Sequence, residues 1–242
     1  MRATELHGCI DPSDRCGLST GWEADLRGDW EAQVSAAREF STSWIELSAL
    51  SRTELASPAG YLSSAASREL EEVAGCSLHG PAKHIASDPD RAASAEEWRK
   101  ADGELAALPG LERFSGIVLH PDTAPDLSAL EPIAGRVIFE NMDCRKRDCR
   151  TADELERVFA ALPEAGFCLD VAHAWTIDPT LEEGRRLLDR FGGRLTHVHV
   201  SGIEPNERHR PTTPADLARY APLLERARHV PWTFESPVVA GG

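Results

Sequence analysis

Eight short apolar segments, spaced at fairly even intervals, constrain the fold of this 242-residue chain more than any other feature. Each segment is too short for a typical helix, and most are rich in the β-branched or aromatic residues that favour strands. The segments cover residues 16–21, 43–50, 76–81, 116–122, 136–143, 166–174, 194–202 and 231–237.

Helical signals fill much of the sequence between these segments. They lie in residues 27–40, 94–108, 151–162, 178–193 and 213–229. Residue types that cap helix N-termini stand at or near the start of four of them, namely Asp29, Ser94, Thr151 and Thr213. Two glycines end the 178–193 segment, which is typical of a helix C-terminus.

The alternation of strand and helix predicts βαβ units and a parallel sheet. Eight such units favour a single closed (β/α)8 TIM barrel. The alternative is a doubly wound open sheet, but no glycine-rich phosphate fingerprint follows an early strand. We expect one barrel domain over 15–242 after a short N-terminal extension over 1–14. Only "VVAGG" follows Pro237, so we expect the last helix to be short or missing.

Charge and cysteine content narrow the function classes. The formal net charge is −14, which disfavours tight binding to duplex DNA because a nucleic-acid phosphate backbone usually requires a basic face. No apolar run is long enough for a membrane span, and the first residues show no hydrophobic leader, so we expect a cytoplasmic protein. The six cysteines form no CxxC pair, so free thiols are expected. Pairing of Cys144 with Cys149 is the alternative.

Polar residues with metal-binding potential end six of the eight predicted strands. Because the carboxyl ends of barrel strands form the active-site face, these residues are expected to converge there. Imidazoles and carboxylates packed together would be poorly solvated, whereas a divalent cation binds both kinds of group. The sequence therefore predicts a metal site. Its residues are His79, His120, Glu140, Asp170, His173, His199 and Glu235, with His209 in the loop after the seventh strand.

Two further features permit more than one interpretation. His197 lies on the same strand as His199 and shares its face, yet we expect it to be structural. The segment after Glu140 carries the densest group of basic residues in the chain, at positions 145, 146, 147 and 150. It is either a solvated loop balanced by neighbouring aspartates or a binding site for an anionic substrate, in which Arg145 and Arg147 would take part.

Four motifs in order, "FENMD", "LDVAHAW", "HVHVSG" and "FESP", resemble those of the xylose isomerase-like barrel superfamily. That superfamily includes sugar isomerases, ketose 3-epimerases, hydroxypyruvate isomerase and endonuclease IV. The resemblance extends from about Cys16 to Pro237.

The resemblance implies a ligand set for a divalent metal. In the mononuclear isomerases and epimerases the matching ligands are Glu140, Asp170, His199 and Glu235, and the two glutamates are also the catalytic proton carriers. His173 and Arg208 match residues that contact substrate. The larger set, for one to three ions of Mn, Mg, Zn, Co or Fe, adds His79, His120, His173, Glu207 and His209. Endonuclease IV has aspartate where this chain has Glu207, which leaves a third ion in question.

The first hypothesis from the sequence is a sugar or sugar-phosphate isomerase or epimerase that works by metal-assisted proton transfer on a small, anionic substrate. A multinuclear phosphoesterase resembling endonuclease IV is the main alternative, since the full ligand set is nearly present. A multinuclear iron oxygenase and a barrel that binds metal without catalysis remain as further alternatives. The sequence does not define the oligomeric state.

Overall fold

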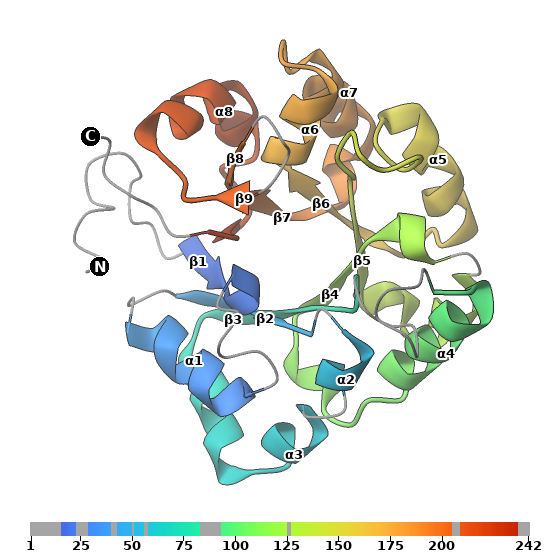
Figure 1. Ribbon diagram of the computed structural model, residues 1–242, viewed down its shortest axis with the longest axis vertical. Coiled ribbons are helices and arrows are strands. Elements are labelled where there is room, and N and C mark those ends of the chain that lie inside the picture. The colour runs from blue at the N-terminus through green and yellow to red at the C-terminus, as the bar shows by residue number, and fades with distance from the viewer. Residues whose placement is uncertain are drawn as a thin grey trace.

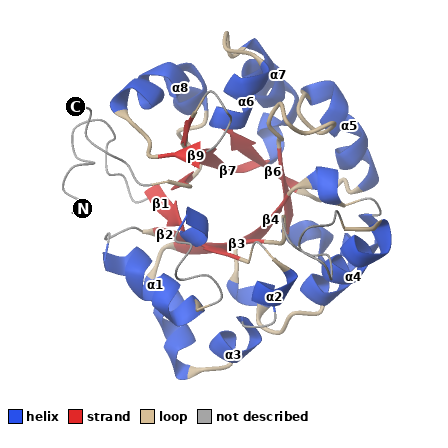
Figure 2. Cartoon of the chain, viewed as in Figure 1, coloured by secondary structure: helices blue, strands red, loops and turns tan. Residues whose placement is uncertain are grey.

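The computed structural model describes residues 16–22, 29–39, 43–49, 51–55, 58–82, 93–124, 127–204 and 209–236. A closed ring of parallel strands lies inside a ring of helices (Figures 1 and 2), in the order β1-β10-β7-β6-β5-β4-β3-β2. The strands are β1 (Cys16–Ser19), β2 (Trp44–Ser48), β3 (Gly75–His79), β4 (Gly116–Leu119), β5 (Val137–Glu140), β6 (Gly166–Asp170), β7 (Leu195–Val200) and β10 (Trp232–Phe234). The predicted TIM barrel is therefore confirmed, and the open sheet is excluded.

The helices connect successive strands around the outside of the barrel. They are α1 (Trp30–Glu39), α2 (Arg52–Leu55), α3 (Pro58–Leu62), α4 (Ala95–Ala106), α5 (Ala152–Ala161), α6 (Val171–Ile177), α7 (Glu182–Phe191) and α8 (Pro214–Arg226). A small antiparallel pair, β8 (Gly202–Ile203) and β9 (His209–Arg210), lies between β7 and α8.

Local capping explains where the predicted helices begin. The Ser94 hydroxyl accepts a hydrogen bond from the Glu97 amide, and the Thr213 hydroxyl accepts one from the Asp216 amide, each as part of a complete capping box. The Thr151 hydroxyl likewise accepts from the amide of Glu154. These bonds satisfy amides that have no partner inside the helix, so the starts of α4, α5 and α8 follow directly from the sequence.

One connection departs from the regular βα pattern. Residues Leu127–Arg136, between β4 and β5, form 3-10 turns with a kink at Ile133. Pro132 lies inside this segment and has no amide hydrogen to donate, so a regular α-helix is disfavoured there. The predicted 1–14 extension and the predicted absence of a helix after β10 concern residues outside those that the structure describes.

The two faces of the strands bury different kinds of side chain. Outward residues such as Ile45, Phe139 and Val198 belong to one large apolar core between the strands and the helices. Inside the barrel, Val118, Ile138 and Cys168 form a separate small apolar cluster. The remaining interior is polar, since Glu46 and His197 are both almost completely buried. Strand alternation thus places the chemically active residues inside the barrel.

Among the residues that the structure describes, no helix is long and apolar enough to cross a membrane. The five described cysteines, Cys16, Cys76, Cys144, Cys149 and Cys168, form no disulfide. Free thiols were expected, and the alternative of a Cys144–Cys149 disulfide is therefore wrong.

Candidate metal centre

The carboxyl ends of the strands bring the predicted ligands together in four overlapping groups, and within each group the ligand atoms lie within 4.8 Å of one another. Three of them we call the central group (Glu140, Asp170, His199 and Glu235), the second group (His79, His120 and Glu140) and the third group (Asp170, His173 and His209); the fourth joins His79 to His199 and Glu235 of the central group. Glu140 and Asp170 end β5 and β6, and each belongs to two groups. Carboxylates shared in this way can bridge neighbouring cations.

The central group lies at the middle of the barrel mouth. His199 Nδ1 is 3.3 Å from Glu235 Oε1 and 3.5 Å from Glu140 Oε2. Glu140 and His199 are completely buried, whereas the Glu235 side chain is 14% exposed and thus forms the rim of the site. The group offers three carboxylates and one imidazole, a donor set that suits Mn²⁺, Mg²⁺ or Zn²⁺.

The second group is built on two histidines that face Glu140. The Nε2 atoms of His79 and His120 lie 3.5 Å and 3.3 Å from Glu140 Oε2. In His79, Nδ1 is 2.9 Å from the Gly80 carbonyl oxygen. A neutral His79 ring that donates its Nδ1 hydrogen to this carbonyl presents the lone pair of Nε2 to the site, as a metal ligand must.

The third group depends on the junction between β6 and α6. Asp170 caps α6 because its Oδ1 accepts a hydrogen bond of 2.7 Å from the His173 amide. His173 Nδ1 donates to the Asn141 carbonyl oxygen at 2.9 Å, which directs Nε2 away from that bond. His209, on β9, completes the group, with its Nδ1 3.4 Å from Glu235 Oε2. Asp170 therefore caps a helix and borders the candidate site at once.

Several buried polar atoms at the barrel mouth have no hydrogen-bond partner within the described part of the chain, and their types and positions indicate whether these residues fit a cation. Buried atoms without a hydrogen-bond partner among the described residues include both Glu140 oxygens, Asp170 Oδ2, His120 Nδ1, His199 Nδ1 and Glu235 Oε2. Such atoms are costly to bury, and a native structure rarely concentrates them without a ligand. The donor types and their spacing therefore fit divalent metal ions.

The charges in the site are strongly coupled. Burial by itself raises the pKa of Glu140, but His199 and His120 lower it well below its ordinary value. Burial would lower the pKa of His173, yet Asp170 and Glu140 raise it to about 10. Burial raises the pKa of Asp170 to about 8. In the metal-free protein, protons bound to Asp170 and His173 thus reduce the repulsion among the clustered carboxylates. A bound cation would take the place of these protons.

Three of the four basic residues after Glu140 form ion pairs with carboxylates. Arg145 Nε and Nη2 donate to Asp143, and the Lys146 ammonium donates to Asp122 at 2.8 Å. Arg150 Nη2 donates to Glu154 at 2.6 Å. These ion pairs support the interpretation of a charge-balanced loop, although Asp143 itself lies 3.8 Å from His173 Nε2 and so joins Arg145 to the edge of the site. Glu207 and Arg208 lie outside the described residues.

Sequence reasoning missed one acidic residue of the site region. Glu46, on β2, is completely buried and lies 3.1 Å from His199 and 3.5 Å from His197. The available signal was a glutamate in the middle of an otherwise apolar strand, "WIELS", two residues before the strand ends. His197, expected to be structural, proves to share this interior position.

Comparison with known proteins identifies the fold. No protein-family model and no curated protein matches the sequence. The structure is similar to that of a D-tagatose 3-epimerase-like protein, with 14% identity over 92% of this chain and 90% of that one and a TM-score of 0.60. It is similar to endonuclease IV from Thermus thermophilus with 18% identity, 92% of each chain covered and a TM-score of 0.60. The chain therefore has the same TIM-barrel fold as these two proteins.

Proposed function

We propose that the chain is a divalent-metal-dependent hydrolase that cleaves a phosphate ester with two or three cations held at the barrel mouth. The observation that carries this proposal is the sharing of Glu140 between the central and second groups and of Asp170 between the central and third groups. A mononuclear site needs only the central group, with His173 as a substrate contact, and would leave His79, His120 and His209 without a common purpose. The geometry therefore favours the multinuclear alternative over the isomerase that the sequence placed first.

When bound, such cations lower the pKa of coordinated water and neutralise charge on a phosphoryl group. The residues of the chain contribute orientation and proton transfer. Glu140 is held between four imidazoles, and the Gly80 and Asn141 carbonyl groups fix the rings of His79 and His173. Glu235 Oε2 lies at the rim, so this carboxylate is placed to accept a proton from a water molecule or a substrate hydroxyl group.

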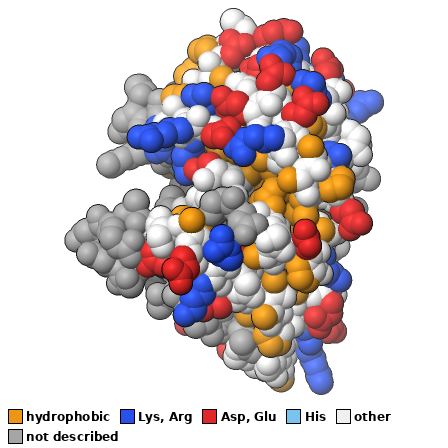
Figure 3. All heavy atoms as spheres, turned by 90° about the vertical axis from the view of Figure 1, so that its right-hand side faces the viewer, with side chains coloured by type: hydrophobic (Ala, Val, Ile, Leu, Met, Phe, Trp, Pro, Cys, Tyr) orange, Lys and Arg blue, Asp and Glu red, His pale blue; other side chains and the backbone are white. Residues whose placement is uncertain are grey.

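The charge distribution supports a small phosphate ester as substrate. The net charge of −14 opposes association with a long polyanion. On the face drawn in Figure 3, acidic and basic side chains are interspersed with no broad basic surface among them. The basic residues after Glu140 that pair with carboxylates, Arg145, Lys146 and Arg150, leave little free positive charge for a duplex.

A second candidate is the isomerase or epimerase. The observation that favours it is the position of Glu140 and Glu235, whose ligand atoms lie within 4.8 Å of each other in the central group. Two carboxylates that flank one point could pass a carbon-bound proton between two positions of a hydroxyketone. This reaction exchanges hydrogen with the solvent, whereas ester hydrolysis does not.

The test compares both reactions on the same preparation. The protein is purified without chelator, its metal content is measured, and it is incubated in D₂O with phosphate monoesters, phosphodiesters, ketoses and ketose phosphates. We expect two or three ions of zinc, manganese or iron per chain, release of phosphate or alcohol, and loss of that activity in His79→Gln and His120→Gln. One ion per chain with deuterium in a recovered ketose, and no ester cleavage, would establish the isomerase instead. Iron with oxygen consumption would indicate the oxygenase.

A further inference from the structure

His199 spans the distance between the barrel mouth and the buried interior. Its Nδ1 faces the central group, 3.3 Å from Glu235 and 3.5 Å from Glu140, and has no hydrogen-bond partner among the described residues. Its Nε2 faces the opposite way and lies 3.1 Å from Glu46 Oε2. One imidazole ring therefore connects a carboxylate inside the barrel to the candidate ligands at the mouth.

Glu46 is itself held in place. Its Oε2 accepts a hydrogen bond of 3.0 Å from the Ser77 hydroxyl group, and the residue is completely buried. Strand pairing places Glu46 beside Ser77, so the β-sheet register fixes this contact. A carboxylate with a fixed position and no access to solvent can impose one orientation and one tautomer on a neighbouring imidazole.

The hydrogen bonds of the other histidines show why His199 needs such a partner. His79 and His173 each have Nδ1 2.9 Å from a backbone carbonyl oxygen, to which a neutral ring donates. His199 presents Nδ1 to the site instead, so its ring hydrogen must lie on Nε2. Glu46 Oε2 is a carboxylate acceptor within hydrogen-bond distance of that nitrogen.

We propose, on the basis of the metal centre in the proposed function, that Glu46 is a positioning residue that holds His199 as the Nε2–H tautomer and directs its Nδ1 lone pair to the central cation. The arrangement is a carboxylate–histidine–metal triad, with the carboxylate one layer deeper in the barrel than the ligands. Loss of such outer partners usually weakens metal affinity by about 10- to 100-fold.

A competing interpretation places a metal inside the barrel. Cys168, His197 and His199 have ligand atoms within 4.8 Å of one another and are all buried. That site would take His199 Nε2 away from Glu46 and require a thiolate. Burial raises the pKa of the Cys168 thiol far above its ordinary value, which opposes this arrangement.

The experiment compares Glu46→Gln with His197→Gln as the matched control. Glu46→Gln neutralises a buried carboxylate, and His197→Gln removes a buried imidazole that lies 3.5 Å from that carboxylate. Of these two residues, only Glu46 lies within hydrogen-bond distance of His199 Nε2. Gln keeps the volume of Glu46, and its amide group can donate to Nε2, which favours the wrong tautomer. Zinc affinity is measured by competition with a chromophoric chelator, and unfolding is followed in the presence of excess chelator.

We expect the zinc affinity of Glu46→Gln to fall by about 10- to 100-fold, while that of His197→Gln stays near the wild-type value. In zinc-loaded wild type with ¹⁵N-labelled histidine, His199 should carry its hydrogen on Nε2. Equal zinc affinities in the two variants would mean that Glu46 is merely structural. An Nδ1–H signal from His199 in the wild type would overturn the proposal without any variant.

The cobalt-substituted protein separates the two sites. A thiolate charge-transfer band that disappears in Cys168→Ser would place the ion inside the barrel and overturn the proposal, whereas its absence supports the mouth site. None of these measurements depends on the substrate. A protein that cleaves no phosphate ester but shows Glu46-dependent zinc affinity would refute the proposed function and leave the role of Glu46 intact.

Discussion

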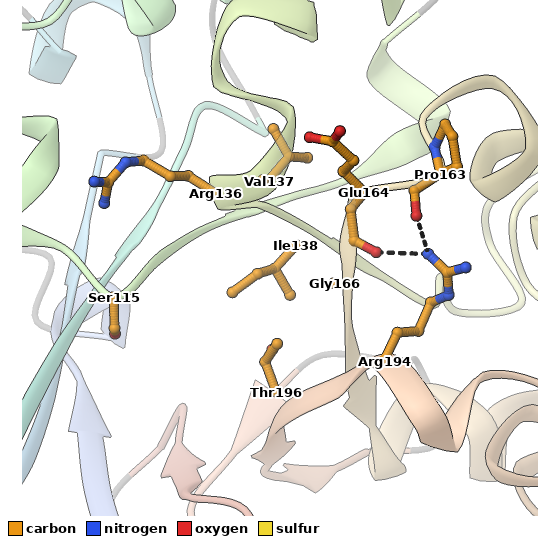
Figure 4. A pocket seen from close by; sticks show the side chains of 11 residues that line it. Ser115, Arg136, Val137, Ile138, Pro163, Glu164, Gly166, Arg194 and Thr196 are labelled. Carbon is orange, nitrogen blue, oxygen red and sulfur yellow. Dashed lines mark hydrogen bonds between the residues drawn. The ribbon is translucent and has the colours of Figure 1, made fainter.

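The two ends of the barrel differ in how far their buried polar atoms find hydrogen-bond partners. At the amino ends of β4 to β7 lies a cavity of about 370 Å³, lined among others by Arg136, Gly166 and Arg194. Figure 4 shows the Arg194 guanidinium bonded to two backbone carbonyl groups, those of Pro163 and Ala165. Arg136 Nη1 likewise donates to the Phe114 carbonyl oxygen. The two arginines that line this cavity are thus satisfied by backbone carbonyl groups.

The carboxyl end shows the opposite combination. At this end a whole set of buried nitrogen and oxygen atoms has no hydrogen-bond partner among the described residues, as at Glu140, Asp170 and His199. None of the residues that line the amino-end cavity has such an atom. Unpartnered buried polar atoms therefore distinguish the carboxyl end of this barrel from the cavity at its amino end.

The largest expected contrast comes from Asp170→Asn. Asn keeps the cap of α6 through its side-chain oxygen but removes a carboxylate shared by two groups. We expect metal affinity and activity to fall by at least about 100-fold, more than for an outer partner of a ligand. Burial raises the pKa of Asp170, so burying this carboxyl group costs stability at pH 7. The free energy of unfolding of the metal-free variant should therefore exceed that of the metal-free wild type by about 1–2 kcal/mol. Calorimetry in chelator checks this, and a less stable metal-free variant would contradict it.

The next largest effect is expected in the pH dependence of metal affinity at the carboxyl end. In the metal-free protein His173 has a pKa of about 10, and that of His199 is also raised, so both rings bind a proton at pH 7 that a metal must displace. Metal affinity should therefore rise with pH, by about tenfold per unit for each proton released, and level off as pH approaches 10. Calorimetric titration in two buffers of different ionisation enthalpy measures the protons released. Affinity that is independent of pH between 6 and 8 would show that these rings are already neutral.

The smallest effect is expected at the amino end. Arg194→Ala removes the bonds to the Pro163 and Ala165 carbonyl groups and the contact of the guanidinium with the Phe159 ring. The free energy of unfolding should fall by about 1–2 kcal/mol. Metal affinity and turnover should not change, and chemical denaturation together with the chelator assay tests both points. A marked loss of metal affinity would show that the two ends are coupled.

Much of the fold was predictable because its signals are local. A cap such as Ser94 or Thr213 acts within four residues, and the apolar segments became strands within a few residues of their expected limits. The ligand positions were predictable for a related reason, since a polar residue that ends a buried strand must lie at the barrel mouth. The metal-ligand roles themselves remain predictions.

What the sequence could not provide depends on contacts across the barrel. Glu46 and His199 are far apart in the chain, and nothing local in "WIELS" shows that its glutamate meets an imidazole on β7. The ion pairs of the loop after Glu140 also depend on tertiary contacts, since Lys146 pairs with Asp122 rather than with a residue beside it. Contacts between residues that are distant in the sequence could therefore not be predicted from it.

The direct passage from β6 into α6 limits how the chain can accommodate insertions. Asp170 is the last residue of the strand and Val171 the first of the helix, so no connecting residue separates them. An insertion there would move a candidate ligand and remove a helix cap at the same time. The neighbouring strand β7, which pairs with β6, is joined to α8 by a longer connection that includes β8 and β9. Changes in chain length would therefore be tolerated in the connection before α8 and rejected before α6, so two neighbouring parts of the entrance differ sharply in how freely their length can vary.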